Sequence, residues 1–206
     1  MTQYIYFDLG KVLLDFEHAK ARRQLAILAN VSESVVQDLI FDDGLLLAFE
    51  TGKIDSQWFH RTFCEATNTN PRIGEFLTAY SDIFEVIPLM EGLVRQLHVQ
   101  QIPLGILSNT SSAHWNHVCD GRFGFLPGSF RNFVLSYEVG SMKPDRAIYD
   151  HAIKLAECTP SEIFFCDDRE ENVAGASAAG FDAVLFETPH QILSEIKQRL
   201  DVDIVF

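Results

Sequence analysis

Basic residues are scarce in this sequence, and several other features are missing from it. Lys and Arg together number 16 against 29 Asp and Glu, which gives a formal net charge of −13. Because binding to nucleic-acid phosphates depends on clustered Lys and Arg, this balance argues against nucleic acid as a partner. No apolar run approaches the ~20 residues of a membrane-spanning helix, and no basic, apolar leader precedes the first predicted strand. We therefore expect a soluble, cytoplasmic protein with no membrane partner.

Cysteine is also sparse, and its spacing excludes two kinds of chemistry. No C-x-x-C pair occurs, so neither a zinc site nor a redox motif is indicated, and we expect reduced, structural thiols. What the chain has in quantity is apolar residues, at 47% of 206 residues with 17 Phe. A chain of this length can bury a substantial core, as one domain or as one domain with an insertion. The four cysteines are Cys64, Cys119, Cys158 and Cys166.

The first candidate for chemistry is Asp8, which directly follows the apolar and aromatic run 4–7. Such a run of β-branched and aromatic residues predicts a buried strand. In open α/β sheets, ligands bind in the crevice outside the carboxyl ends of the strands, so a carboxylate at that end lies where chemistry occurs. Taken alone, Asp8 is equally typical of a turn or a helix cap. The residues that end the later strands decide between these interpretations.

The rest of the chain shows two different patterns of apolar residues. Residues 18–84 show helical periodicity, with capping residues such as Ser32 and Ser56 ahead of apolar residues three and four apart. From Pro88 onward, short apolar runs alternate with helical stretches, which predicts right-handed parallel βαβ units. The expected fold class is therefore α/β, with a doubly wound parallel-sheet (Rossmann-like) core and an inserted all-helical cap. We assign residues 1–16 and 87–206 to the core, and residues 17–86 to a cap over the carboxyl ends of the strands.

Individual elements follow from the same patterns. We expect strands at residues 102–107, 133–135, 163–166 and 183–186, helices at 89–99, 111–119, 144–157, 171–179 and 189–200, and a short edge strand at 202–206.

Two loops that follow predicted strands carry groups suited to an anion. Ser108 and Asn109 open the loop after the strand at 102–107, where a hydroxyl, an amide and backbone N–H donors at a helix start can bind anion oxygens. A simple helix cap is the alternative. Lys143 precedes Pro144 just before a predicted helix, and a lysine there can reach across the strand ends as a point charge on phosphate. Its alternative is a solvated surface lysine.

The strongest single feature is the pair Asp167 and Asp168, which ends the apolar run 163–166. Three carboxylates at neighbouring strand ends, with Asp8 as the third, would repel one another unless a cation lies between them. Hard oxygen ligands beside a phosphate substrate indicate Mg²⁺. A helix N-terminal cap that complements the helix dipole explains one Asp but not the pair.

Together these residues resemble the haloacid dehalogenase-like hydrolase superfamily, in the branch with a helical cap inserted after the first motif. The resemblance covers nearly the whole chain, and its Asp-Leu-Gly first motif is similar to that of bacterial glucose-1-phosphate phosphatase-type members. Four motifs in the family's order form a specific signal, whereas any one alone is weak. They lie at residues 7–12, 107–110, 142–144 and 165–168, the last followed by Asn172.

The resemblance implies a role for each matching residue. Asp8 would attack phosphorus and form an aspartyl phosphate, and Asp8, Asp168 and the backbone carbonyl of Gly10 would ligate Mg²⁺. This division suits phosphoryl transfer, which depends on positioning and on charge neutralisation. The phosphoryl oxygens would be held by Ser108, Asn109 and Lys143. The site would be supported by Asp167 and Asn172.

One position departs from the family pattern. Most phosphatases of the superfamily carry a second aspartate two residues after the nucleophile, which protonates the leaving alcohol and then activates water. Here that position is Gly10, and loss of such a group typically costs about 10²- to 10⁴-fold in rate. A phosphatase could compensate with a good leaving group, such as an anomeric sugar phosphate, or could recruit Asp15, His18 or a substrate hydroxyl.

Three functions are therefore open. The favoured one is Mg²⁺-dependent hydrolysis of a small phosphate monoester of a metabolite, with a sugar 1-phosphate as first guess. A haloacid dehalogenase also lacks the second aspartate, but works without metal and without the carboxylate pair. A non-catalytic module that binds a phosphorylated ligand or a protein is the third. The segment 49–55 resembles a substrate-proximal part of related caps or, equally, forms a tight turn at Gly52. The oligomeric state is left undefined.

Overall fold

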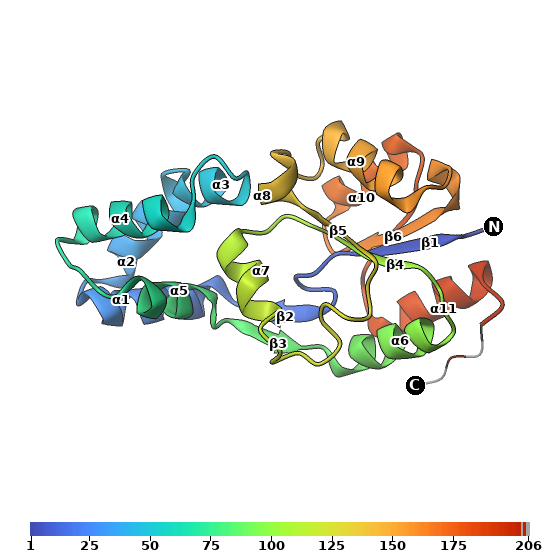
Figure 1. Cartoon of the computed structure of the whole chain (residues 1–206), viewed down its shortest axis with the longest axis horizontal. Coiled ribbons are helices and arrows are strands. Elements are labelled where there is room, and N and C mark those ends of the chain that lie inside the picture. The colour runs from blue at the N-terminus through green and yellow to red at the C-terminus, as the bar shows by residue number, and fades with distance from the viewer. Residues whose placement is uncertain (203, 205–206) are drawn as a thin grey trace.

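A computed structural model describes residues 1–202 and 204 of the chain. Five parallel strands form one sheet in the order β5-β4-β1-β6-β7, with helices on both faces (Figure 1). The predicted α/β, doubly wound fold class is confirmed. The chain fills one side of β1 with β4 and β5, then crosses to add β6 and β7 on the other side, so the carboxyl end of β1 is a topological switch point. The strands are β1 (Tyr4–Phe7), β4 (Leu104–Ser108), β5 (Asn132–Leu135), β6 (Ile163–Asp167) and β7 (Asp182–Leu185).

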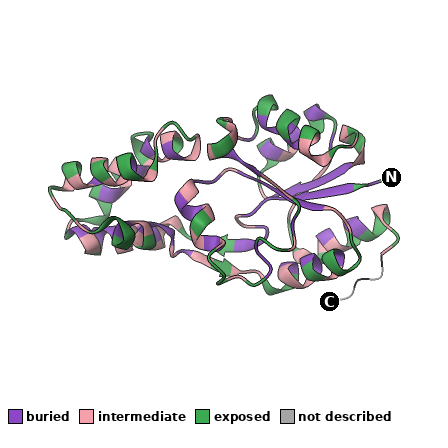
Figure 2. Cartoon of the chain, in the orientation of Figure 1, coloured by how far each residue is buried: buried purple, intermediate pink, exposed green. Residues whose placement is uncertain are grey.

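Alternation along β1 explains how the sheet is covered on both faces. Successive side chains of a strand point to opposite faces, and both sets here are apolar or aromatic. Ile5 and Phe7 pack in one hydrophobic cluster, while Tyr4 and Tyr6 pack in the other. The strand is therefore buried throughout, as the purple strands of Figure 2 show. Helices α6 (Pro88–Val99) and α11 (Pro189–Arg199) contribute to the first cluster, and α9 (Arg146–Ala156) and α10 (Glu170–Ala179) to the second.

The helices between β2 and β3 lie beside the sheet as a separate layer at the left of Figure 1. They have an aromatic core of their own, in which Phe59 contacts Phe49, Phe76 and Tyr80 with ring centroids 4.5 to 5.3 Å apart. We call this layer the cap helices. They are α1 (His18–Ala29), α2 (Glu33–Val36), a π-helical turn (Gln37–Asp42), α3 (Leu45–Glu50), α4 (Ser56–Thr67) and α5 (Ile73–Ser81).

A two-stranded antiparallel sheet joins the cap helices to the parallel sheet. It consists of β2 (Leu14–Phe16) and β3 (Phe84–Val86), with Asp15 opposite Glu85. The sequence predicts no strand in this region, since three residues are too few to show an alternating pattern. Within the described residues, no helix is long and apolar enough to cross a membrane.

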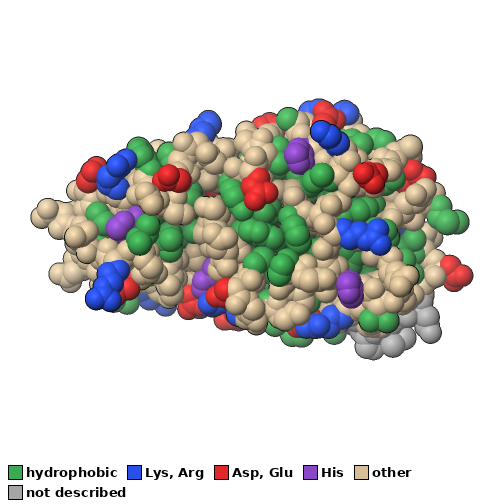
Figure 3. Space-filling view, in the orientation of Figure 1, with side chains coloured by type: hydrophobic (Ala, Val, Ile, Leu, Met, Phe, Trp, Pro, Cys, Tyr) green, Lys and Arg blue, Asp and Glu red, His purple; other side chains and the backbone are tan. Residues whose placement is uncertain are grey.

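Smaller differences from the expected elements occur at helix starts and at the chain end. The helix predicted from residue 144 begins at Arg146, and two short helices, α7 (Ser112–Val118) and α8 (Ser136–Val139), follow β4 and β5. The edge strand expected at 202–206 lies largely outside the described residues. All four cysteines are free thiols. On the face drawn in Figure 3, acidic and basic side chains are interspersed rather than gathered by sign.

Candidate active site

The carboxyl ends of three adjacent strands bring the sequence-predicted polar residues together. Asp8 follows β1, Ser108 ends β4 and Asp167 ends β6, and these strands are neighbours in the sheet. The backbone N–H of Asp8 donates to the carbonyl of Cys166 at 3.1 Å, which continues the ladder past the last strand residue. All three side chains are buried although they are polar. A buried polar group must have partners, so their contacts define the site.

Lys143 is the cation of this cluster. Its Nζ lies 2.9 Å from Oδ1 of Asp8 and 2.5 Å from Oδ2 of Asp167, and it donates to the carbonyl of Leu107 at 2.9 Å. The side chain is only 1% exposed. The interpretation of Lys143 as a surface lysine is thus wrong. One buried ammonium thus lies between two buried carboxylates.

Asn109 fixes the backbone from which Lys143 projects. Its Nδ2 donates to the Lys143 carbonyl at 2.9 Å, and its Oδ1 accepts from the Lys143 N–H at 2.8 Å. This two-point contact ties the loop after β4 to the segment before α9. The side-chain amide of Asn109 is therefore engaged with Lys143, although the residue lines the cavity above.

The two carboxylates after β6 are held differently. Oδ1 of Asp167 accepts from Nδ2 of Asn172 and from the N–H of Arg169, both at 2.9 Å, while its Oδ2 accepts from Lys143. Both oxygens of Asp167 are thus occupied by donors of the protein. Asp168 is only partly buried and lines the cavity, so its carboxylate is the one of the pair that faces an incoming group.

Burial and charge together set the protonation of the cluster. The pKa of Asp8 is raised to about 6, chiefly by burial; Lys143 opposes the shift and the neighbouring Asp167 adds to it. For Lys143, burial alone would lower the pKa, but the two carboxylates outweigh it and the pKa is raised. Burial, followed by the charge of Asp167, raises the pKa of Asp168. The site therefore has one cation for three carboxylates and favours a further positive charge.

The three carboxylates fit a hard divalent cation. Asp8, Asp167 and Asp168 each offer one oxygen, and these oxygens lie within 4.8 Å of one another. Carboxylate oxygens are ligands that Mg²⁺ prefers. Because both oxygens of Asp167 already accept from Asn172, Arg169 and Lys143, Asp8 and Asp168 are the carboxylates that could bind a cation directly.

A cavity of about 260 Å³ opens above these groups. Its floor includes Asp8, Ser108, Lys143 and Asp168, from the strand ends and their loops. Its roof comes from the cap helices, which contribute residues of α3. The cavity is also lined by Gly10, Lys11, Phe16, His18, Leu46, Glu50, Asn109, Met142, Arg169 and Asn172.

Comparison with known proteins identifies this arrangement. A family model described as haloacid dehalogenase-like hydrolase matches residues 3–180. The chain belongs to the haloacid dehalogenase-like hydrolase family. The predicted family is thus confirmed, and the chain is a hydrolase whose curated relatives include phosphatases.

Three relatives of this hydrolase are informative. It is 26% identical over 191 residues to the D-ribitol-5-phosphate phosphatase of Bacteroides thetaiotaomicron, covering 88% of this chain and 90% of that protein. A predicted family hydrolase from Porphyromonas gingivalis has the same fold, with a TM-score of 0.82, 22% identity and coverage of 98% of this chain and 100% of that one. The family enzyme bt-2542 from Bacteroides thetaiotaomicron, in complex with magnesium and inorganic phosphate, gives a TM-score of 0.80, 24% identity, and coverage of 91% and 95%.

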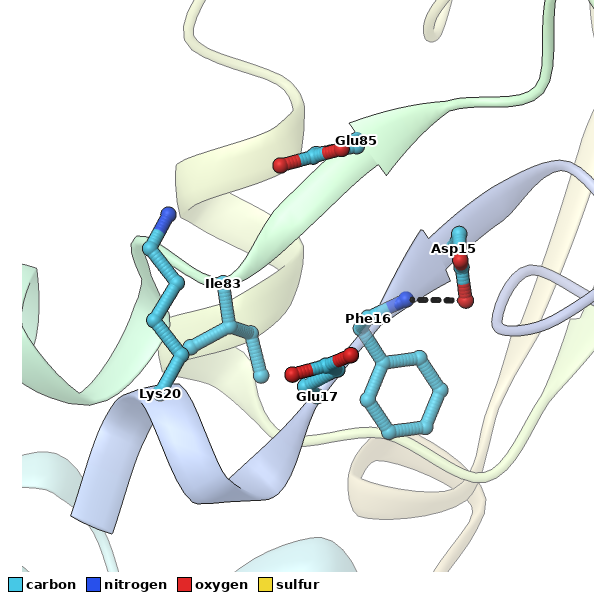
Figure 4. Close-up of a pocket in the computed structure, with 6 residues that line it drawn as sticks. All are labelled: Asp15, Phe16, Glu17, Lys20, Ile83 and Glu85. Carbon is cyan, nitrogen blue, oxygen red and sulfur yellow. Dashed lines mark hydrogen bonds between the residues drawn. The ribbon is translucent and has the colours of Figure 1, made fainter. Parts of the chain in front are cut away.

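Two residues named as substitutes for the missing acid and base line different pockets of this hydrolase. Asp15 is exposed, its Oδ1 lies 2.5 Å from Nζ of Lys11, and it lines a different pocket of about 170 Å³ with Lys20 and Glu85 (Figure 4). That pocket lies where β2 and β3 meet the start of α1. His18, by contrast, lines the cavity above Asp8 and is half-buried.

Sequence reasoning missed two polar residues of the hydrolase. Ser136, fully buried, accepts from the N–H of Thr110 at 2.9 Å and donates to its carbonyl at 3.0 Å, which holds the loop after β4. Glu50 projects from the end of α3 into the cavity. The sequence predicts that its segment, 49–55, is substrate-proximal or forms a turn, but no local signal marks Glu50 itself. Both placements depend on contacts between segments far apart in the sequence.

Proposed function

We propose that this chain is a Mg²⁺-dependent phosphatase that hydrolyses a small phosphate monoester through an aspartyl phosphate on Asp8. The observation that carries the proposal is the contact between Lys143 Nζ and both Asp8 and Asp167 beneath a roofed cavity. A nucleophilic carboxylate next to a fixed ammonium is the arrangement that phosphoryl transfer needs, because catalysis of that reaction depends on positioning and charge neutralisation.

Each group of the cluster has a part in this reaction. One oxygen of Asp8 attacks phosphorus, and the hydroxyl of Ser108 and the ammonium of Lys143 bind phosphoryl oxygens. Asn109, which the sequence placed among the phosphate ligands, holds the Lys143 backbone with its side chain. Asp167 and Asn172 orient Lys143 and the loop after β6.

Residues 17–86 act as a cap over this cluster. Mg²⁺ fits the carboxylate and carbonyl oxygens that the cluster leaves for a cation. Asp8, Asp168 and the carbonyl of Gly10 would hold the ion, which supplies charge neutralisation to the phosphoryl group when bound. The family enzyme bt-2542 was solved with magnesium and phosphate, which supports the same cofactor here.

The substrate is a small phosphorylated metabolite. A cavity of about 260 Å³ lies below the range of roughly 300–1,000 Å³ that is typical of drug-sized ligands. The relative named for D-ribitol 5-phosphate adds phosphorylated polyols to the sugar 1-phosphates that Gly10 first indicated. The panel of substrates should therefore include both classes of ester.

Phosphate release tests the proposal. Sugar 1-phosphates, ribitol 5-phosphate, an acyl phosphate and 4-nitrophenyl phosphate are assayed with Mg²⁺ and with chelator. Asp8→Asn is the inactive variant, and Asp150→Asn on the exposed side of α9 is the matched control. We expect turnover that requires Mg²⁺, persists in Asp150→Asn and is absent in Asp8→Asn. Lack of turnover on every ester by the unmodified protein would contradict the phosphatase and favour a non-catalytic binding module.

A further inference from the structure

The position that carries the missing carboxylate is closed by an aromatic ring. A Cβ built on Gly10 would lie 2.6 Å from Cε1 of Phe16. Phe16 is held between His18, at 5.0 Å between ring centroids, and Phe84, at 5.8 Å. Position 10 therefore lacks an acidic side chain, and the ring of Phe16 occupies the space that such a side chain would need. A group that exchanges a proton with the substrate must come from elsewhere in the cavity lining.

Glu50 is the carboxylate that the cap helices add to this lining. It is the last residue of α3 and lines the cavity above Asp8, together with Asp8 and Gly10. It also lines an adjoining hollow of about 60 Å³ together with Gly10, Ser108 and His18. Glu50 thus borders the same space as the nucleophile's loop and the phosphate-binding hydroxyl, from the opposite side of the site.

We propose that Glu50 is the proton donor and acceptor of the phosphatase reaction, brought over Asp8 by the cap in place of a carboxylate at position 10. This inference rests on the proposed function. The fit is chemical as well as geometric, because burial raises the pKa of Glu50 to about 7 while Arg169 opposes the shift. A general acid and base works best when its pKa lies near the working pH.

The other titratable side chains around this space are less suited. Burial lowers the pKa of His114 to about 3, and its ring stacks on Tyr80 with centroids 4.3 Å apart. Burial also lowers the pKa of His18, which disfavours the imidazolium form that a proton donor needs. The charged and titratable groups that line the two hollows or couple to Glu50 are Asp8, Lys11, His18, Tyr80, His114, Lys143, Asp168 and Arg169.

The proposed proton transfers balance over two steps. In the first, an oxygen of Asp8 bonds to phosphorus while the bond from phosphorus to the ester oxygen breaks. The electron pair of that bond goes to the ester oxygen, which takes the proton of Glu50 and leaves as an alcohol. In the second, Glu50 takes a proton from water as the water oxygen bonds to phosphorus. The bond between Asp8 and phosphorus breaks, its electron pair returns to the carboxylate, and phosphate leaves with Glu50 protonated again.

The approach of α3 to the core depends on a second glycine. Gly52 has a φ of +68°, and a Cβ there would lie 2.1 Å from the carbonyl oxygen of Tyr137 in α8. Backbone therefore packs on backbone directly after Glu50, and the labels α3 and α8 are adjacent in Figure 1. Gly44, at the other end of α3, has a similar φ of +77° but no atom within 4 Å of a Cβ. An alanine at Gly44 would therefore introduce only the strain of the left-handed backbone, whereas an alanine at Gly52 would introduce this strain and a steric clash.

Two variants and two controls test the inference. Glu50→Gln removes the proton, and Glu65→Gln changes an exposed glutamate of α4. Gly52→Ala obstructs the approach of α3, and Gly44→Ala carries only the backbone strain. Each is assayed with Mg²⁺ on a sugar or polyol phosphate and on 4-nitrophenyl phosphate, whose leaving group needs no proton. Thermal melting confirms that each variant is folded.

We expect Glu50→Gln to lower kcat on the alkyl ester by about 10²- to 10⁴-fold. On 4-nitrophenyl phosphate it should release one nitrophenolate per protein in a burst, because the first step survives and hydrolysis of the aspartyl phosphate is slow. Gly52→Ala should reproduce the loss on the alkyl ester, and both controls should stay within about twofold of the unmodified protein.

Three results would overturn the inference. The first is alkyl-ester turnover in Glu50→Gln within about twofold of the unmodified protein. The second is an equal loss on both substrates without a burst, and the third is a rise in KM at unchanged kcat, as expected of a residue that only binds a substrate hydroxyl. If instead the unmodified protein hydrolyses no ester, the proposed function itself fails, and the inference fails with it.

Discussion

Nζ of Lys143 lies 2.5 Å from Oδ2 of Asp167, and neither side chain is more than 1% exposed. The same ammonium is 2.9 Å from Asp8. A buried ion pair repays the loss of hydration only when its geometry is good, and removal of one partner leaves an uncompensated charge. We therefore expect Lys143 to contribute to folding as well as to the site, and the two contributions can be separated by experiment.

We predict that Lys143→Met destabilises the fold by about 3–5 kcal/mol, because Asp8 and Asp167 then stay buried without their cation. The measurement is urea unfolding in the presence of chelator. Lys154→Met, on the exposed side of α9, should change the free energy of unfolding by less than about 0.5 kcal/mol. A loss below about 1 kcal/mol for Lys143→Met would show that the carboxylates are not held as charges.

Mg²⁺ should stabilise the protein through Asp168. A ligand that binds only the folded state adds about 2.7 kcal/mol at a concentration of 100 times its Kd. We predict that Mg²⁺ raises the melting temperature of the unmodified protein and of Asp150→Asn, and that Asp168→Asn loses most of this shift. An equal shift in Asp168→Asn would place the ion elsewhere.

Stability should depend on pH through Glu50. Its folded-state pKa of about 7 is raised from 4.5 by burial, so folding takes up a proton between these values. The stabilisation from this shift is present below pH 4.5 and is lost as the pH rises through 7. Glu50→Gln, which stays neutral, should therefore be close to the unmodified protein at pH 4.5 and more stable at pH 8, by up to about 3 kcal/mol.

Unfolding by urea at pH 4.5 and pH 8 measures this difference, with Glu65→Gln as the control that should show none. A gap between Glu50→Gln and the unmodified protein that does not grow with pH would mean that Glu50 keeps its ordinary pKa in the fold.

Restoring an aspartate at position 10 should fail unless Phe16 is also changed. The new Cβ would meet the ring at 2.6 Å, and overpacking of this kind typically costs about 1–3 kcal/mol. We predict that Gly10→Asp destabilises the unmodified background and that Phe16→Ala relieves most of this cost. A double-mutant cycle of unfolding free energies gives the coupling. Additive effects, with coupling below about 0.5 kcal/mol, would show that the ring simply moves aside.

The positions of several site residues can be predicted from the sequence, because the topology of a parallel sheet brings its strand ends together. Asp8 and Asp167 each follow an apolar run, and parallel strands end at one edge of the sheet, so the two meet without further information. Lys143, by contrast, was identified as a site residue only by its place beside Pro144 and by the family pattern. Its contacts with Asp8, Asp167 and Leu107 are all long-range.

Features that depend on packing between distant segments were not readable. The strands β2 and β3 are too short for periodicity to show, and they pair across 68 to 72 positions of sequence. Glu50 lines the cavity, and two residues later Gly52 packs against the carbonyl of Tyr137, a contact that no local pattern encodes. The closure of position 10 by Phe16 likewise follows from the turn between β1 and β2 and not from either residue alone.

The most direct test of the account is the fate of solvent oxygen in a single turnover in H₂¹⁸O. If an aspartyl phosphate forms on Asp8 and water attacks phosphorus, the label should appear in the released phosphate, and the peptide that contains Asp8 should stay unlabelled by mass spectrometry. Hydrolysis of an ester intermediate at the carboxyl carbon, as expected of a dehalogenase, would place the label in Asp8. Label in Asp8, or a turnover that releases unlabelled phosphate, would contradict the account.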